Sequence, residues 1–157
     1  MPYMSLVSND NYMLEALKEA RAAFDRWEIP VGAVVVDSQD GKIISRAGNE
    51  TEKLQDPTAH AELLAIRRAC ILKSAPRLTE CDLYVTLEPC PMCAAGISFA
   101  RLRRVYFGAY DPKGGGVEHG PKIFSHATCH HRPDIYGGIH EMECAALMRD
   151  FFRDKRG

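Results

Sequence analysis

A chain of 157 residues fits one compact domain with a full hydrophobic core, and two domains would be cramped. Hydrophobic residues make up 46% of it and charged residues 26%, which is ordinary for a soluble globular protein. No apolar run approaches the length needed to cross a bilayer. The net charge of −1 gives no support of its own to nucleic-acid binding, although RLRR (101–104) and FFRDKR (151–156) are locally basic.

The N-terminus lacks the basic start and apolar run of a secretory signal, which predicts a cytoplasmic protein. Thiols stay reduced in that compartment. The six cysteines, at positions 70, 81, 90, 93, 129 and 144, are therefore interpreted as core residues plus metal ligands rather than as three disulfides.

The first third of the chain predicts a helix and a hairpin. Apolar residues step by three or four from Asn9 to Trp27, which is typical of one face of an amphipathic helix, and Pro30 is expected to end it. The segments VGAVVVD (31–37) and KIISRAGN (42–49) flank the polar turn SQDG and predict a β-hairpin.

Helices and strands alternate through the rest of the chain. We expect a helix from about Ala59, a strand in CDLYVTL (81–87), a helix in PMCAAGISFARL (91–102) and a strand in RRVYFGAY (103–110). A glycine-rich loop (111–120), a short helix, a short strand near Ile135 and a helix from about 141 to 155 follow. This order predicts a single-domain α/β protein over residues 1–157: a three-layer α/β/α sandwich whose mixed sheet has about five strands, the later ones parallel.

The motif LEPCPMC (87–93) places two cysteines three residues apart at the end of a strand and the start of a helix. Pro91 suits the first helical position, and the helix N-terminus lowers thiol pKa values, so both cysteines are expected as thiolates. This geometry fits a redox pair, half of a structural zinc cage, or two ligands of a catalytic metal.

A third ligand favours the catalytic metal. His60 and Glu62 stand at the start of another predicted helix, where they must act from its first, irregular turn. One imidazole with the thiolates of Cys90 and Cys93 gives three protein ligands to zinc and leaves a fourth position open for water. The pattern H-x-E with P-C-x-x-C is the known signature of the zinc nucleobase deaminases.

The chemistry explains these residue types. Zinc lowers the pKa of a bound water from about 15.7 toward 7, so hydroxide becomes available at neutral pH. Glu62 is suited to take the proton from that water and pass it to a ring nitrogen. Hydroxide is then expected to attack the amino-bearing carbon, and ammonia to leave after a second proton transfer.

From end to end the chain resembles the bacterial tRNA-specific adenosine deaminases of the cytidine deaminase-like superfamily. The matching segments are EIPVGAVVV, the asparagine of AGNE, DPTAHAELLAIR, LYVTLEPCPMCAAGISFARLRRVYFGAYDPKGG and ECAALMRDFFRDKR. H-A-E with P-C-x-x-C marks the superfamily, while D-P-x-A-H-A-E, F-G-A-x-D-x-K-x-G and the terminal F-F-R narrow it to the tRNA enzymes.

The resemblance implies a specific activity: hydrolysis of the wobble adenosine in an arginine tRNA with an ACG anticodon to inosine, by a homodimer with one Zn²⁺ per subunit. It implies the site residues as well. His60, Cys90 and Cys93 would ligate zinc, and Glu62 would transfer protons. Asn49 would hydrogen-bond the flipped base, and the backbone around Ala61, Leu87 and Glu88 would line the pocket. Asp111 and Lys113 would lie near the RNA backbone, and Phe152 and Arg153 would contact the anticodon stem-loop.

The sequence departs from the family pattern after Lys113, where it continues GGGVEHG and then PKIFSHATCHH. His126, His130 and His131 are interpreted as surface or RNA-facing residues rather than as further ligands. Of the adjacent Phe151 and Phe152, only one can face fully inward on a helix, which leaves the other available to RNA.

Three other functions stay open at this point. A free-base guanine or cytosine deaminase of the same superfamily shares the metal motif. A non-catalytic zinc-stabilised RNA-binding protein would enclose its metal fully and would not need Glu62. A redox protein would use Cys90 and Cys93 without His60.

Overall fold

The computed structural model describes residues 9–156. Its helices and strands, in chain order, are α1 (Asn9–Asp25), β1 (Gly32–Asp37), β2 (Ile43–Gly48), α2 (Ala61–Lys73), β3 (Cys81–Leu87), α3 (Pro91–Ala100), β4 (Arg104–Ala109), the short 3-10 helix η2 (Ile123–Ser125), β5 (Asp134–Tyr136) and α4 (Glu141–Arg156). Every helix and strand predicted from the sequence is found, with ends that differ by one or two residues in most cases.

The five strands form one mixed sheet in the order β2-β1-β3-β4-β5. β1 pairs antiparallel with β2 on one side and with β3 on the other. β3 pairs parallel with β4, and β4 parallel with β5. All strands except β1 therefore run in the same direction, which confirms the predicted parallel crossovers and places the ends of β2, β3 and β4 at one edge.

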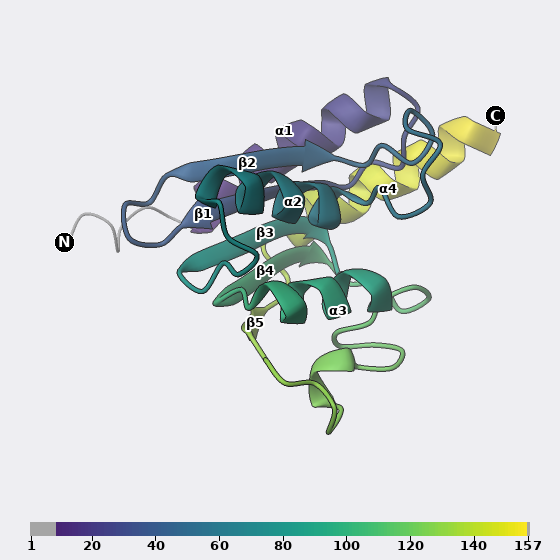
Figure 1. The fold of residues 1–157 in the computed structure, drawn as a ribbon. Helices are drawn as coiled ribbons and strands as arrows, with labels where there is room; N and C mark the ends of the chain where they lie inside the picture. Colours follow the sequence, from purple (N-terminus) through teal and green to yellow (C-terminus); the bar gives the residue numbers. More distant parts are fainter. Residues whose placement is uncertain (1–8, 157) are drawn as a thin grey trace.

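Helices cover both faces of the sheet, which confirms the three-layer sandwich. α2 and α3 lie on one face, and α1 and α4 lie on the other (Figure 1). The buried core has two parts accordingly: one joins α2 and α3 to inward residues such as Val35 and Leu83, and the other joins α1 and α4 to Val34 and Tyr84. A Cβ at Gly32 would stand 2.0 Å from the carbonyl oxygen of Ala16, so glycine allows α1 to approach β1 closely.

The sequence prediction was wrong at the ends of two helices, because α1 and α3 each stop two residues early. We expected α1 to run to Trp27 and to be ended by Pro30, but it ends at Asp25. Trp27 has a φ of 60°, and its N–H and that of Glu28 donate to the carbonyls of Phe24 and Ala23, which is a Schellman cap. Ser74 and Arg101 end α2 and α3 in the same left-handed conformation.

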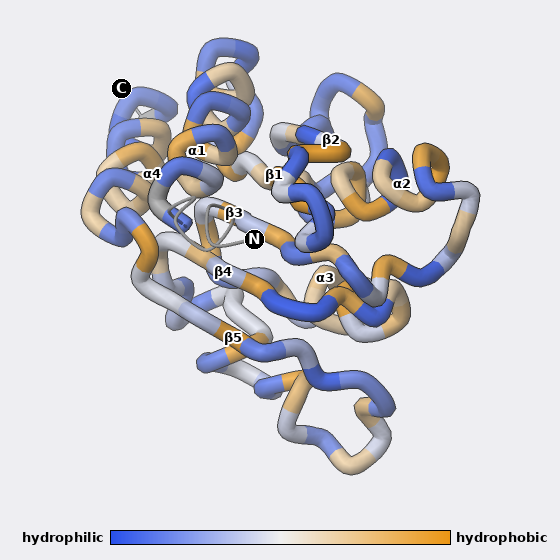
Figure 2. The backbone as a smooth tube through the Cα atoms, turned by 90° about the vertical axis from the view of Figure 1, so that its left-hand side faces the viewer, coloured by the Kyte–Doolittle hydropathy of each residue, from blue (hydrophilic) through white to orange (hydrophobic). Residues whose placement is uncertain are grey.

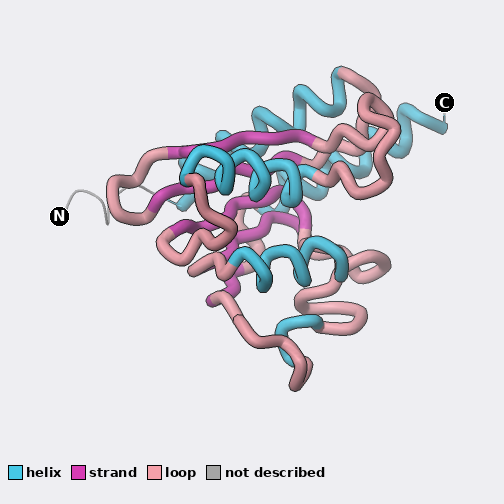
Figure 3. The backbone as a smooth tube through the Cα atoms, in the orientation of Figure 1, coloured by secondary structure: helices cyan, strands magenta, loops and turns pink. Residues whose placement is uncertain are grey.

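The remaining segments are loops, of which the longest joins β4 to β5 and contains only η2 (Figure 3). Hydrophilic and hydrophobic stretches alternate along α1 and α4, as expected for helices that cover a sheet (Figure 2). Within residues 9–156, no helix is both long enough and apolar enough to span a membrane.

Candidate metal centre and substrate pocket

The site lies at the edge of the sheet where β2, β3 and β4 end, because chain segments that follow parallel strands meet there. His60 is the N-cap of α2 and Cys90 the N-cap of α3, both with extended backbone. Pro91 occupies the first turn of α3, as predicted, and Cys93 follows in the same turn. The N-termini of two helices thus point at one place, where their dipoles favour negative charge.

Three ligand atoms converge at these helix starts. The Nδ1 atom of His60 lies 3.6 Å from Sγ of Cys90 and 3.5 Å from Sγ of Cys93. All three ligand atoms lie within 4.8 Å of one another, and among the described residues they form the one such group of histidine, cysteine or carboxylate ligands. Tetrahedral zinc with bonds of about 2.0 Å to nitrogen and 2.3 Å to sulfur separates its ligand atoms by roughly 3.6 Å. The residues therefore fit zinc without rearrangement.

The two thiols differ in acidity. A hydrogen bond from Cys93 lowers the pKa of Cys90 to about 4, with His60 acting in the same direction against the effect of burial. The pKa of Cys93 is raised, because its thiol donates to Cys90 and is buried. Without the metal, the two sulfur atoms share one proton, which the thiol of Cys93 donates to Cys90. Metal ligation by Cys93 requires that proton to leave.

Glu62 lies beside this group in the first turn of α2 and is 4% exposed. Burial raises the pKa of its carboxyl to about 7, and the nearby Cys90 sulfur adds to the rise. A carboxyl group in this range can both accept and donate a proton near neutral pH. The geometry thus supplies a proton carrier adjacent to, but separate from, the three ligands.

A pocket of about 460 Å³ opens over the metal group. Its walls contain His60, Glu62, Cys90 and five of the predicted substrate-binding residues besides Phe152: Asn49, Leu87, Glu88, Asp111 and Lys113. Ala61, the residue after His60, is fully buried and does not line the pocket. Arg153 lines an adjoining hollow on α4 together with Arg149, and this hollow shares Met148 and Phe152 with the pocket.

Of the two adjacent aromatics on α4, Phe151 is fully buried and Phe152 is 39% exposed at the pocket. This confirms that one of the pair faces inward and the other is available at the surface.

Sequence reasoning did not identify five further wall residues: Ile29, Val31, Thr51, Gly114 and Met148. Ile29 and Val31 belong to the matched segment EIPVGAVVV, which precedes β1 and so begins at the same edge of the sheet. That adjacency was the signal that could have identified them. Gly114 and Met148 also lie in matched segments, next to Lys113 and one helical turn before Phe152, whereas Thr51 carried no such signal.

Asn49 is held by a short chain of hydrogen bonds. Its Nδ2 donates to Oγ1 of Thr51 at 3.2 Å, and Thr51 in turn donates to the carboxylate of Glu28 at 3.4 Å. Glu28 is 2% exposed and also accepts the backbone N–H groups of Glu52 and Lys53. The buried carboxylate therefore fixes the segment after β2, with Asn49 at its start.

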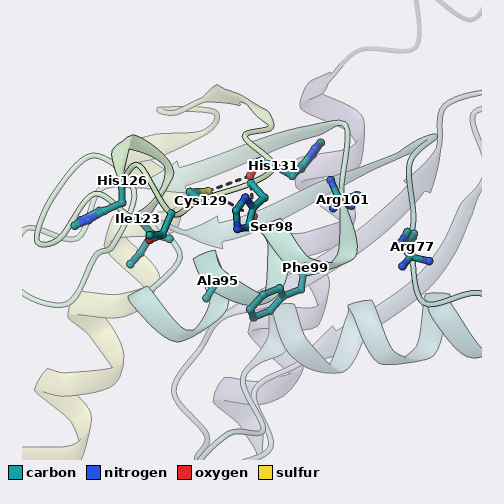
Figure 4. A pocket seen from close by; sticks show the side chains of 11 residues that line it. Arg77, Ala95, Ser98, Phe99, Arg101, Ile123, His126, Cys129 and His131 are labelled. Carbon is teal, nitrogen blue, oxygen red and sulfur yellow. Dashed lines mark hydrogen bonds between the residues drawn. The ribbon is translucent and has the colours of Figure 1, made fainter.

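Three histidines in the second half of the β4–β5 loop, His126, His130 and His131, do not line the pocket over the metal group. His126 and His131 hydrogen-bond to the carbonyl oxygens of Pro121 and Leu102. A second hollow of about 450 Å³ lies there, between α3 and the loop, where Ser98 hydrogen-bonds to the carbonyl oxygen of His131 (Figure 4). His126 and His130 are exposed and His131 is half-buried.

The sequence of this chain is similar to those of known deaminases. Residues 7–109 match the family of the cytidine and deoxycytidylate deaminase zinc-binding region. A tRNA-specific adenosine deaminase of Agrobacterium fabrum is 56% identical over 96% of this chain and 98% of its own length. The chain belongs to the tRNA-specific adenosine deaminases. As a member of this zinc-binding deaminase family, it takes zinc as its cofactor.

Solved structures agree with membership of the tRNA-specific adenosine deaminases. A structure from a study of A-to-I editing by tRNA:A34 deaminases superposes with a TM-score of 0.85 at 57% identity, covering 87% of this chain and 98% of that one. A guanine deaminase from Bacillus subtilis superposes with a TM-score of 0.62 at 39% identity, covering 66% of each chain. The likeness to the tRNA:A34 deaminase thus extends over more of both chains.

Proposed function

We propose that this deaminase hydrolyses the wobble adenosine in the anticodon of an arginine tRNA to inosine and releases ammonia. The observation that carries the proposal is a group of three metal ligands, His60, Cys90 and Cys93, with the buried carboxyl of Glu62 beside it at the base of an open pocket. Three protein ligands leave a fourth zinc position for water, as catalytic rather than structural sites do.

Zinc, when bound by the three ligands, lowers the pKa of a coordinated water toward neutrality. Glu62 would accept a proton from the attacking water and deliver it to a ring nitrogen of the base, while the water oxygen bonds to the amino-bearing carbon. A second proton transfer, to the amino group, would then let it leave as ammonia as its C–N bond breaks. The position of Glu62 in the first turn of α2, one residue beyond Ala61, brings its carboxyl to the ligand group without using it as a ligand.

The pocket walls suit a flipped nucleobase. Asn49 provides an amide that can pair with the edge of a purine, and Leu87 and Glu88 line the same pocket. Asp111 and Lys113 stand at the rim, where the sugar and phosphate of the target nucleotide would lie. An anticodon loop offers an unpaired base and avoids the full cost of opening a duplex.

The shape of the surface favours a polynucleotide over a free base. The pocket continues into the hollow on α4 lined by Met148, Arg149, Phe152 and Arg153, so a ligand seated over the metal can extend along this helix. Two arginines and an exposed aromatic ring are groups that contact phosphates and stack on bases. A free guanine or cytosine would leave this surface unused.

The alternative free-base activity is tested by substrate comparison. The protein is incubated with an arginine tRNA carrying an ACG anticodon and, separately, with guanine and with cytosine, while inosine and ammonia are measured. The proposal predicts inosine at the wobble position and no ammonia from the free bases. If a free base releases ammonia and the tRNA stays unmodified, the proposal is wrong and the free-base alternative is supported.

We also propose that the protein acts as a homodimer through the face formed by α2 and α3. Ile71, Leu72 and Phe99 expose 78%, 62% and 80% of their surface on these two helices, although each is strongly apolar. The hollow beside Phe99 is lined by Arg77 and Arg101 as well as apolar groups (Figure 4). Apolar residues with arginines are typical of protein interfaces.

A cytoplasmic location remains part of this proposal. It fits the state of the cysteines, all six of which are free thiols rather than disulfide partners.

A further inference from the structure

The carboxylate of Glu88 is buried and accepts hydrogen bonds on both of its oxygens. This group is fully buried behind the pocket wall, one residue after β3 and two residues before Cys90. Both oxygens accept hydrogen bonds: Oε1 accepts from the N–H of Asp111 at 3.0 Å and from Nδ1 of His119 at 2.8 Å. Oε2 accepts from the N–H groups of Val117, Glu118 and His119, at 3.2, 2.9 and 3.1 Å.

All five donors come from one loop, the segment from Asp111 to His119 that follows β4. This segment, which we call the rim loop, carries Asp111, Lys113 and Gly114 at the mouth of the pocket. The carboxylate thus links the segment just before Cys90 to the loop whose residues 111–114 line the pocket. Hydrogen bonds to a buried ionised acceptor are about twice as strong as neutral ones, and a buried charge must be compensated in this way.

The glycines of the rim loop are required by this contact. A Cβ at Gly115 would stand 2.4 Å from Oε2 of Glu88, and one at Gly116 would stand 2.5 Å from the backbone nitrogen of Pro91. The N–H of Gly116 also donates to the carbonyl of Pro89 at 2.8 Å. The segment GGGVEHG, in which the sequence departs from the family pattern, therefore wraps around the carboxylate of Glu88.

We propose that Glu88 is a positioning residue for the substrate: its carboxylate fixes the rim loop so that Asp111 and Lys113 stand at the mouth of the pocket. His119, the last residue of the rim loop, hydrogen-bonds to this carboxylate through its side chain. Neither group touches the reacting atoms. The inference rests on the proposed function, because the object that the loop positions is the nucleotide at the metal site.

A variant with Glu88→Gln tests this inference. An amide keeps the size of the side chain but loses its charge. Its NH2 group would also face backbone N–H groups, from which it cannot accept hydrogen bonds. Four quantities are measured on the zinc-loaded full chain: KM and kcat with an anticodon stem-loop carrying ACG, zinc content, and hydrogen exchange of the backbone amides in residues 111–119.

We expect KM for the stem-loop to rise about ten-fold with kcat changed less than about three-fold, since binding is weakened and the chemistry is retained. Amides of residues 111–119 should exchange faster, while those of β3 and α3 keep their protection and zinc stays near one per chain. Glu118→Gln is the matched control, because it removes one negative charge from the same loop while its exposed side chain takes no part in the contact. It should leave KM and exchange unchanged.

His119→Gln is the second variant, for use if Glu88→Gln does not fold. It removes the imidazole but leaves the four backbone donors, so KM should rise about three-fold with the same local gain in exchange. Unchanged KM and unchanged exchange in a folded variant would overturn the inference, and so would a loss of kcat alone. Failure of the wild-type protein to convert the stem-loop would instead refute the proposed function, and hydrogen exchange would still report whether Glu88 holds the loop.

Discussion

At the scale of single residues, the function depends on side chains placed at two helix starts. The sequence could predict His60, Glu62, Cys90 and Cys93 together, because their spacing is a local pattern with a direct chemical meaning. The burial of Glu88 under the rim loop could not be predicted. Its donors lie 23 to 31 residues further along the chain, and nothing in the spacing of the sequence brings them to its carboxylate.

The metal ligands are tested by their effect on zinc content. Cys90→Ser should lower zinc from about one ion per chain to well below half, because a hydroxyl is a poor substitute for a thiolate ligand. Cys70→Ser is the control, since this half-buried cysteine on α2 is not part of the metal group. Elemental analysis of the two purified proteins checks the prediction, which fails if Cys90→Ser keeps a full complement of zinc.

At the scale of helices and strands, the sequence predicted which elements exist but not how three helices end. The apolar repeat of α1 continues to Trp27, so the pattern alone could not reveal a cap formed by a bulky residue in the left-handed region. Glycine is the usual residue at such positions, and its absence at Trp27, Ser74 and Arg101 removes the signal that marks a helix end.

The cap at Ser74 gives a prediction for stability. Ser74→Gly should raise the free energy of unfolding by about 0.5–1 kcal/mol, because glycine adopts a positive φ without the steric cost of a Cβ. Ser74→Ala keeps the Cβ and should give no gain. Thermal unfolding of the three proteins with zinc bound measures the effect, and a glycine variant no more stable than the wild type would contradict it.

The end of β1 gives a prediction for pH dependence. A hydrogen bond from Lys73, on α2, lowers the pKa of Asp37 below its usual value, with the N–H of Gln39 contributing. A lowered folded-state pKa adds stability above the unfolded pKa of about 3.9 that is lost as the pH falls through the folded value. Lys73→Met should therefore lower the melting temperature at pH 7, and the difference from wild type should shrink below pH 4.

The control for this experiment is Lys42→Met, which removes an exposed lysine that forms no ion pair within residues 9–156. It should change the melting temperature little at any pH. A difference between Lys73→Met and wild type that stays constant from pH 7 to pH 3 would show that the ion pair with Asp37 is not its cause.

At the scale of the whole molecule, the alternation of helices and strands predicted the sandwich, since strand–helix–strand units close in a right-handed, parallel manner. The sequence did not reveal that β1 lies inside the sheet, antiparallel to both neighbours. A hairpin pattern predicts the pairing of its own two strands, but not which strand pairs with the outer edge of either one. That arrangement brings Ile29 and Val31, just before β1, to the same edge as the ends of β2, β3 and β4. The assignment of residues 1–157 to one domain stays a prediction.

The proposed dimer is also tested at this scale. Phe99→Glu should convert a species of twice the chain mass into one of the chain mass, because the charge cannot be buried without a partner. Met142→Glu is the matched control: its side chain is 84% exposed, comparable with 80% for Phe99, but it lies on α4 across the sheet. Light scattering over a range of concentrations measures both, and a wild-type protein that is monomeric throughout would contradict the dimer.

The most direct measurement of the central claim compares the wild-type protein with Glu62→Gln on an anticodon stem-loop carrying ACG. Glutamine keeps the size of the buried side chain but cannot accept the proton, so inosine formation should fall by at least about a thousand-fold while zinc stays at one ion per chain. A Glu62→Gln protein that keeps zinc and converts the stem-loop at the wild-type rate would contradict the account.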